Sequence, residues 1–193
     1  MRESKKSLKI ERCLKLNQIN KKMKINLGSG QDIKEGFVNV DFIEDEGIDV
    51  IHNLNQYPYP FDDSSVEEIY ARDIMEHLDN PNKFIKELWR IGKPNCKIWI
   101  RTPHFSSFYA WADLTHQRPF SYFVFNPYDI NNKSNGLINK KNIKFRIHNH
   151  INLGIYGRLG LEWLANKFPF IYERYLAYTF PAGDIQFNLE VIK

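Results

Sequence analysis

Residues 24–41 read KINLGSGQDIKEGFVNVD, and this stretch decides the fold. Residues 25–27 have the apolar character of a buried strand's end, and Gly28 and Gly30 follow with only Ser29 between them. Glycine has no Cβ and tolerates positive φ, so a Gly-x-Gly turn after a strand lets the backbone pass close to a ligand. A second strand over 37–41 ends on Asp41, where nucleotide-binding sheets place an acid that holds ribose hydroxyls. The stretch therefore predicts the start of a nucleotide-binding sheet.

The rest of the chain alternates strand and helix signals. One helix is clear, since Asn80 can cap it, Pro81 suits its first position, and Gly92 with Pro94 stops it. We also predict a turn over 32–35, one or two helical turns over 73–78, and helical segments over 120–125 and 159–168. Further strands are predicted over 48–51, 66–71, 97–101, 143–151 and 185–192. Together these elements predict an α/β fold, a doubly wound, mostly parallel seven-stranded sheet with helices on both faces.

Composition and charge indicate one domain with a basic extension. The 193 residues, 42% hydrophobic, suffice for one core, and the sequence has no run of about 18 apolar residues that would cross a membrane. Residues 1–24 hold nine lysines and arginines against two glutamates, although the whole chain has a net charge of only +4. We expect residues 1–23 to be a helical extension that could touch RNA, an anionic membrane or a partner, and residues 24–193 to be the domain. Cys13 and Cys96 lie far apart without a CxxC motif, which favours a reduced, cytoplasmic setting.

Four segments carry a resemblance to a known family: INLGSG at 25–30, GFVNVD at 36–41, YPFDDSSVEEIYARDIMEHL at 59–78 and ELWRIGKPNCKIWIRTP at 87–103. In this order and spacing they resemble the class I S-adenosylmethionine (SAM)-dependent methyltransferases, above all the small bacterial members of the type 11 kind. The resemblance covers residues 24–103 well and the C-terminal part loosely. Ser29 stands where the family often has Cys or Ala, and residues 94–96 read Pro-Asn-Cys in place of Pro-Gly-Gly. The resemblance implies a Rossmann-like fold and SAM as cofactor.

The resemblance also implies where the cofactor would bind. The Gly-x-Gly backbone would pass the methionine and ribose parts of SAM, the acid after the second strand would hold the ribose, and the residues after the third strand would hold adenine. The residues after the fourth strand would lie at the methionine end. The implied positions are Gly28, Ser29, Gly30, Asp41, Asn53, Leu54, Arg72 and Asp73. An ordinary glycine turn and a solvent-facing acid are the alternatives for the first strand pair.

A metal site is a second, less favoured reading of the residues after the fourth strand. Asp73, Glu76 and His77 are spaced i, i+3 and i+4, so a helix would place all three on one side. Some methyltransferases of RNA 3′ ends and of ubiquinone precursors have a similar ligand set at this position, and His104 or His116 could add a fourth ligand. Many relatives have Glu-His here without a metal, so we expect none.

The segment after the fifth strand, about 104–142, is expected to roof the acceptor site, because ligands of open α/β sheets lie beyond the carboxyl ends of the strands. DLTHQRPF at 113–120 resembles an Asp-Pro-x-His-x-x-x-Phe stretch of the small methyltransferases. His116, with Asp113 three residues before it and His104 as a further candidate, could take the proton of an acceptor hydroxyl. The alternative is that His116 only pins the loop by hydrogen bonds.

These observations predict a SAM-dependent methyltransferase (EC 2.1.1.-). The sulfonium of SAM already makes its methyl group electrophilic, so the protein has to place the nucleophile and remove its proton. We expect transfer to a small-molecule or glycan acceptor, at oxygen. Two alternatives stay open: an RNA or protein methyltransferase guided by the basic extension, and a SAM-binding module without turnover.

Overall fold

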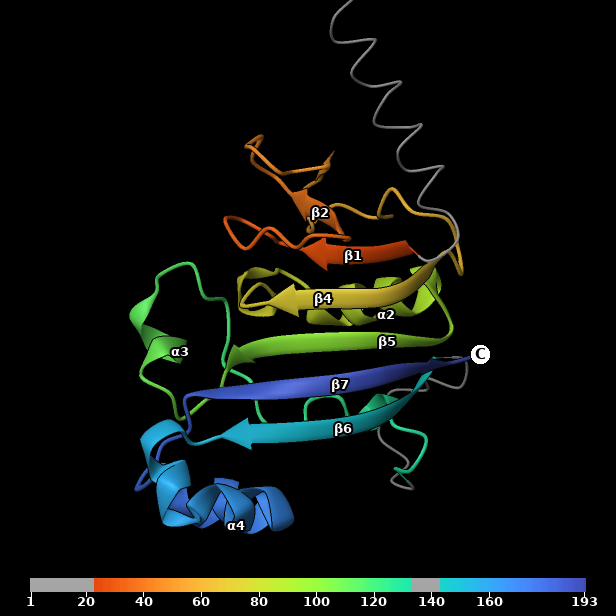
Figure 1. Cartoon of the computed structure of the whole chain (residues 1–193). Helices are drawn as coiled ribbons and strands as arrows, with labels where there is room; N and C mark the ends of the chain where they lie inside the picture. Colours follow the sequence, from red (N-terminus) through yellow and green to blue (C-terminus); the bar gives the residue numbers. More distant parts are fainter. Residues whose placement is uncertain (1–22, 133–142) are drawn as a thin grey trace, which may run out of the picture.

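Seven strands form one sheet in the computed structural model, which describes residues 23–132 and 143–193. The strands are β1 (Met23–Leu27), β2 (Val38–Asp41), β3 (Val50–Ile51), β4 (Val66–Arg72), β5 (Gly92–Pro103), β6 (Lys144–Asn152) and β7 (Asp184–Ile192). Their order is β3-β2-β1-β4-β5-β7-β6 (Figure 1). Only β7 runs antiparallel to its neighbours, which confirms the predicted seven-stranded, mostly parallel sheet.

The crossover from β1 to β2 contains no helix. Residues 28–37 contain turns at 29–32 and 34–37 in place of the one predicted over 32–35, and two buried asparagines of the strands hold them. The Asn26 side chain donates to the Asp32 carbonyl at 2.7 Å and to Asn39 Oδ1 at 3.0 Å. Asn39 Oδ1 also accepts from the Lys34 backbone N–H at 3.0 Å. Hydrogen bonds of side-chain amides thus stabilise this crossover, whereas longer crossovers are stabilised by a helix that packs on the sheet.

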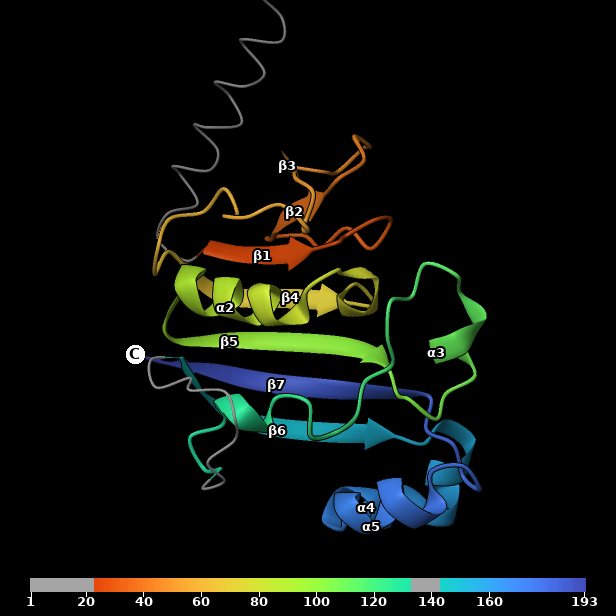
Figure 2. The same ribbon diagram turned by 180° about the vertical axis from the view of Figure 1, so that it is seen from behind.

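The helix α2 (Pro81–Ile91) confirms the predicted capping. The Asn80 side chain accepts a hydrogen bond from the Lys83 N–H at 3.0 Å, and Gly92 ends the helix. Its buried face consists of Phe84, Ile85, Leu88 and Ile91 together with Glu87. This face packs on the sheet beside β4 and β5 (Figure 2). Burying such large apolar side chains stabilises the fold by about 1.5–3 kcal/mol each.

The remaining helical segments are short: η1 (Met75–His77), α3 (Tyr109–Ala112), η2 (Asn126–Tyr128), η3 (Gly154–Leu159), α4 (Leu161–Lys167), α5 (Pro169–Ile171) and the π-helical η4 (Tyr172–Leu176). The turns predicted over 73–78 correspond to η1, and the helix predicted over 159–168 is confirmed as the shorter α4. The helix predicted over 120–125 is wrong. Phe120 forms a β-bridge with His104, residues 122–125 are turns, and the 3₁₀ segment η2 comes only afterwards.

The described helices do not cover the two faces of the sheet equally. In Figures 1 and 2, α2 lies on one face and α4 lies beyond the β6 edge, whereas no described helix lies over β4, β5 and β7 on the face turned to the viewer in Figure 1. The strand residues that alternate with the buried ones are polar or aromatic, as in the stack of Tyr70 on Trp99 with ring centroids 4.4 Å apart. The predicted helical extension over 1–23 lies outside the described residues, apart from Met23 in β1. No helix in the described ranges is long and apolar enough to span a membrane.

Candidate active site

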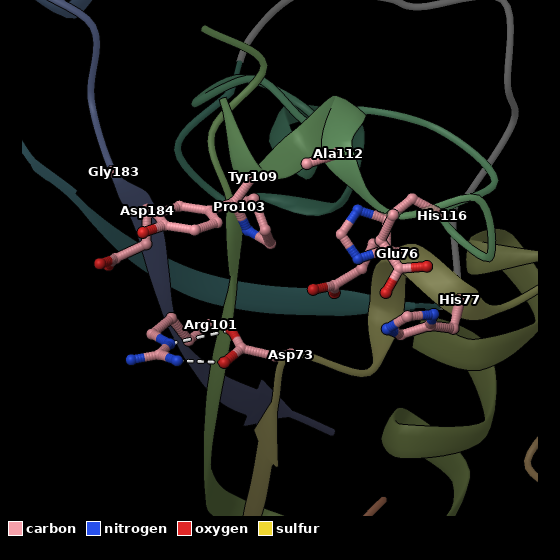
Figure 3. Close-up of a pocket in the computed structure, with 11 residues that line it drawn as sticks. Asp73, Glu76, His77, Arg101, Pro103, Tyr109, Ala112, His116, Gly183 and Asp184 are labelled. Atoms are coloured by element: carbon pink, nitrogen blue, oxygen red, sulfur yellow. Dashed lines mark hydrogen bonds and ion pairs between the residues drawn. The ribbon is translucent and has the colours of Figure 1, made fainter. Parts of the chain in front are cut away.

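Two cavities lie at the edge of the sheet where the parallel strands end. The narrow cavity, about 250 Å³, is lined by Gly28, Asp41, Phe42, His52, Asn53, Leu54, Asn55, Ile74, His77 and Leu78. The wide cavity, about 580 Å³, is lined by Asp73, Glu76, His77, Arg101, Pro103, Tyr109, Ala112, Asp113, His116, Gly183 and Asp184 (Figure 3). His77 is common to both linings, so the two cavities adjoin at its side chain.

The two glycines after β1 serve different purposes. Both have positive φ, +65° at Gly28 and +47° at Gly30. A Cβ on Gly28 would lie 2.5 Å from Cγ1 of Ile74, so the backbone here is in close contact with another lining residue of the narrow cavity. A Cβ on Gly30 would meet no atom within 4 Å. Gly28 is therefore needed for packing and conformation, and Gly30 for conformation alone, with open space beside it.

Asp41 is buried at the end of β2 and binds backbone N–H groups on both sides of the narrow cavity. Its Oδ2 accepts from Gly30 N at 2.8 Å, and its Oδ1 accepts from Phe42 N at 2.7 Å and Ile43 N at 3.2 Å. A carboxylate oxygen has two lone pairs. Oδ1 is therefore saturated, and Oδ2 keeps one lone pair for a further donor.

The far wall of the narrow cavity is largely apolar. Asn53 and Leu54, both expected from the sequence, line it after β3. Phe42, Ile74 and Leu78 add apolar surface that the sequence analysis missed. The position of Phe42 directly after the strand-end acid is a local signal for this role. The narrow cavity is therefore largely apolar, with the Asp41 carboxylate at one end.

Four residues expected at the site lie outside both linings: Ser29, Gly30, Arg72 and His104. Ser29 is buried with its hydroxyl 3.4 Å from the Val40 carbonyl. Arg72 is exposed and lies 3.6 Å from the Asp32 carboxylate. His104 is fully buried.

Both ring nitrogens of His104 are engaged within the core. Nδ1 lies 2.8 Å from Ser106 Oγ, and Nε2 lies 3.1 Å from the Glu173 carboxylate. Glu173 also accepts from Ser121 Oγ at 2.7 Å and from Tyr122 N at 2.6 Å. His104 therefore ties the end of β5 to η4 and has no access to the wide cavity.

Asp73 lies on the floor of the wide cavity, paired with Arg101. Arg101 Nε donates to Asp73 Oδ1 at 2.9 Å, and Nη2 donates to Oδ2 (Figure 3). Asp73 has a φ of +50°, a conformation that side chains seldom adopt and that is common at functional sites. Because both oxygens of the Asp73 carboxylate accept hydrogen bonds from Arg101, Asp73 is paired with Arg101 and not with the other acids and histidines of the cavity.

Glu76, His77 and His116 form a cluster between the two cavities. Each offers one nitrogen or oxygen atom that lies within 4.8 Å of the other two, and the two imidazole rings are 4.7 Å apart (Figure 3). Glu76 Oε2 accepts from Thr102 Oγ1 at 2.9 Å, whereas its buried Oε1 has no partner among the described residues. Burial raises the pKa of Glu76 to about 7. Burial, and then the charge of His116, lowers the pKa of His77.

A chain of side-chain hydrogen bonds links Asp113 to His77 through Thr115. Its Oδ1 accepts from the backbone N and from Oγ1 of Thr115, at 2.8 Å and 2.7 Å, and these bonds lower the pKa of Asp113. Thr115 Oγ1 in turn lies 2.9 Å from His77 Nδ1. His116 is linked to Asp113 by a backbone bond alone, from His116 N to the Asp113 carbonyl at 3.2 Å.

Comparison with known proteins agrees with this geometry. Residues 29–100 match a family model described as a methyltransferase domain. A SAM-dependent methyltransferase from Archaeoglobus fulgidus superposes with a TM-score of 0.59 at 15% identity, covering 95% of this chain and 94% of that one. One from Mesorhizobium loti has a TM-score of 0.52 at 10% identity, covering 87% and 90%.

A longer protein and a negative result complete the comparison. Phosphoethanolamine N-methyltransferase 2 of Haemonchus contortus, solved with SAM, has a TM-score of 0.51 at 13% identity, covering 89% of this chain and 48% of its own. No functionally curated protein matches the sequence. At these identities the likeness to solved structures concerns the fold.

Proposed function

We propose that this chain is a class I SAM-dependent methyltransferase that transfers the methyl group of SAM to a hydroxyl of a small-molecule or glycan acceptor held in the wide cavity, a proposal supported by the match of residues 29–100 to a methyltransferase domain and by the shared fold. The observation that carries this proposal is the meeting of two cavities at His77. A two-substrate transfer requires one compartment for each substrate and a shared boundary at which the reacting atoms meet.

The narrow cavity suits the adenosine part of SAM. Its apolar wall, with Phe42, Leu54 and Ile74, would pack against adenine. The open lone pair of Asp41 Oδ2 would accept one ribose hydroxyl. The methionine part would then run past the open space at Gly30 toward Asp73 and the wide cavity.

The cluster at the boundary supplies the proton acceptor. The acceptor oxygen attacks the methyl carbon, the carbon–sulfur bond breaks with its electron pair going to sulfur, and S-adenosylhomocysteine leaves. The hydroxyl proton must leave in the same process. His116 is the proposed base, because its Nδ1 lies 3.3 Å from the Ala110 carbonyl and must carry a hydrogen there, which leaves Nε2 able to accept.

The proposal is tested with the full chain, SAM and matched panels of hydroxylated compounds, glycans and their amino analogues. We expect S-adenosylhomocysteine release and an O-methylated product, identified by mass spectrometry. Methylation confined to the amino analogues would overturn the assignment of oxygen. Failure to bind SAM in calorimetry would overturn the proposed function as a whole.

A further inference from the structure

Glu76, His77 and His116 each present one nitrogen or oxygen atom to the cluster, within 4.8 Å of the other two. Oε1 of Glu76 is the clearest candidate for a ligand atom, since the side chain is only 2% exposed and this oxygen has no partner among the described residues. Leaving a buried polar atom without a partner destabilises a fold, and an unpartnered oxygen in a cavity wall is available to a ligand.

The hydrogen bonds of the two histidines fix the positions of their protons. A backbone carbonyl can only accept, so the nitrogen of His116 that faces the Ala110 carbonyl, Nδ1, carries the hydrogen. Thr115 Oγ1 has one hydrogen and donates it to the Asp113 carboxylate, so it must accept from His77 Nδ1. In both neutral rings Nε2 therefore has a lone pair, and Nδ1–H is held by an oxygen.

We infer that Glu76, His77 and His116 bind a divalent first-row transition cation, with Zn²⁺ as the best-matched ion. Two imidazole nitrogens and one carboxylate oxygen, with further positions left to water or substrate, are a donor set that such cations prefer over Mg²⁺ or Ca²⁺. Metal-binding histidines usually donate their other N–H to a carbonyl or to a chain leading to a carboxylate. The bonds to Ala110 and, through Thr115, to Asp113 are of that kind.

Distance and charge agree with a cation at this place. With bonds of about 2.0–2.2 Å, neighbouring donor atoms of a tetrahedral ion lie about 3.3–3.6 Å apart. The donor atoms here lie within 4.8 Å of one another, so the side chains would close around the ion by up to about 1 Å when it binds. Asp73, Asp113 and Asp184 add three carboxylates to the wide cavity against the single Arg101, which gives it a field that attracts cations. The cavity also leaves room for water and for an acceptor oxygen.

The catalytic role of the ion rests on the proposed function. A cation bound here would hold the acceptor oxygen and lower the pKa of its hydroxyl, so that the proton passes to solvent. The imidazole of His116 would then act as a ligand and not as the base.

Binding is measured on the full chain without a polyhistidine tag, after dialysis against chelator. We expect one equivalent of Zn²⁺ in calorimetry and a visible absorption band when Co²⁺ is the probe, with Mg²⁺ failing to compete. Glu76→Gln, His77→Gln and His116→Gln should each weaken Zn²⁺ binding by at least about tenfold. His148→Gln, at an exposed histidine of β6, is the matched control and should bind like the parent chain. Thermal melts identify any variant that fails to fold.

The result that would overturn the inference is specific. If the parent chain and all three variants bind Zn²⁺ equally weakly, the three lone pairs do not form a site, and a proton shared within the cluster explains the geometry. An assay of methyl transfer distinguishes the failure of this inference from the failure of the proposed function. Chelator-treated chain should still bind SAM, lose turnover and regain it with Zn²⁺, whereas turnover unaffected by chelator would overturn the inference and leave the proposed function standing.

Discussion

Replacing Gly28 by alanine should destabilise the chain more than the same change at Gly30. Both residues have positive φ, where a side chain costs about 1–2 kcal/mol. At Gly28 the new Cβ would also lie 2.5 Å from Cγ1 and 2.9 Å from Cβ of Ile74. The position of a Cβ is fixed by the backbone, so no rotamer of Ile74 removes the contact. Such overpacking costs about 1–3 kcal/mol more.

The expected loss is therefore about 2–5 kcal/mol for Gly28→Ala and about 1–2 kcal/mol for Gly30→Ala. The entropy that alanine removes from the unfolded chain is the same in both variants and cancels in their difference. Urea unfolding without SAM, extrapolated to water, measures the two free energies of unfolding, since any effect on cofactor binding is then absent. Equal losses in the two variants would refute the assigned contact with Ile74.

Three further outcomes follow from the site. Asp41→Ala should weaken S-adenosylhomocysteine binding roughly tenfold or more in calorimetry, about 1–3 kcal/mol, while the nearby exposed Asp45→Ala should not; unchanged affinity would remove Asp41 from the ribose site. His116→Ala should lower turnover by about 10²–10⁴-fold with SAM affinity intact, against an unaffected His148→Ala control; a rate that only follows the folded fraction would make His116 a loop-pinning residue. In a Cys13→Ser chain, Cys96 should resist thiol reagents at pH 8 until urea unfolds it, since burial raises its pKa to about 12; rapid labelling of the native chain would contradict that burial.

The elements that the sequence predicts well depend on short-range chemistry. Asn80 and Pro81 begin α2 and Gly92 ends it because caps act within one turn of a helix. β1 and β2 follow from apolar runs bounded by glycine and aspartate. Three lining residues of the narrow cavity follow from the same signals: Gly28 comes directly after β1, Asp41 is the last residue of β2 and Asn53 follows β3 by two residues, and parallel strands end at the same edge.

The position of His104 in the fold is decided by a partner far along the chain. His104 looks like a roof residue by position, but it is buried by Glu173, which lies 69 residues later. Arg72 is exposed at the end of β4 and lies 3.6 Å from the Asp32 carboxylate and 3.5 Å from the Asp73 carboxylate. The cluster of Glu76, His77 and His116 is predictable from the sequence only in part. Glu76 and His77 are adjacent in the sequence, but only the folded loop brings His116 beside them in place of Asp73.

The helix-free crossover between β1 and β2 has a consequence for the exchange of cofactor and product. Residues 28–37 are held by amide hydrogen bonds from Asn26 and Asn39, and no helix fastens them to the sheet. Opening this segment breaks a few hydrogen bonds and leaves the main apolar core covered, so it requires far less free energy than global unfolding. We therefore expect the loop to open as a separate unit and to let spent cofactor leave while the strands stay in register. Amide hydrogens of residues 29–37 should exchange with deuterium well before those of β1, and bound S-adenosylhomocysteine should slow them.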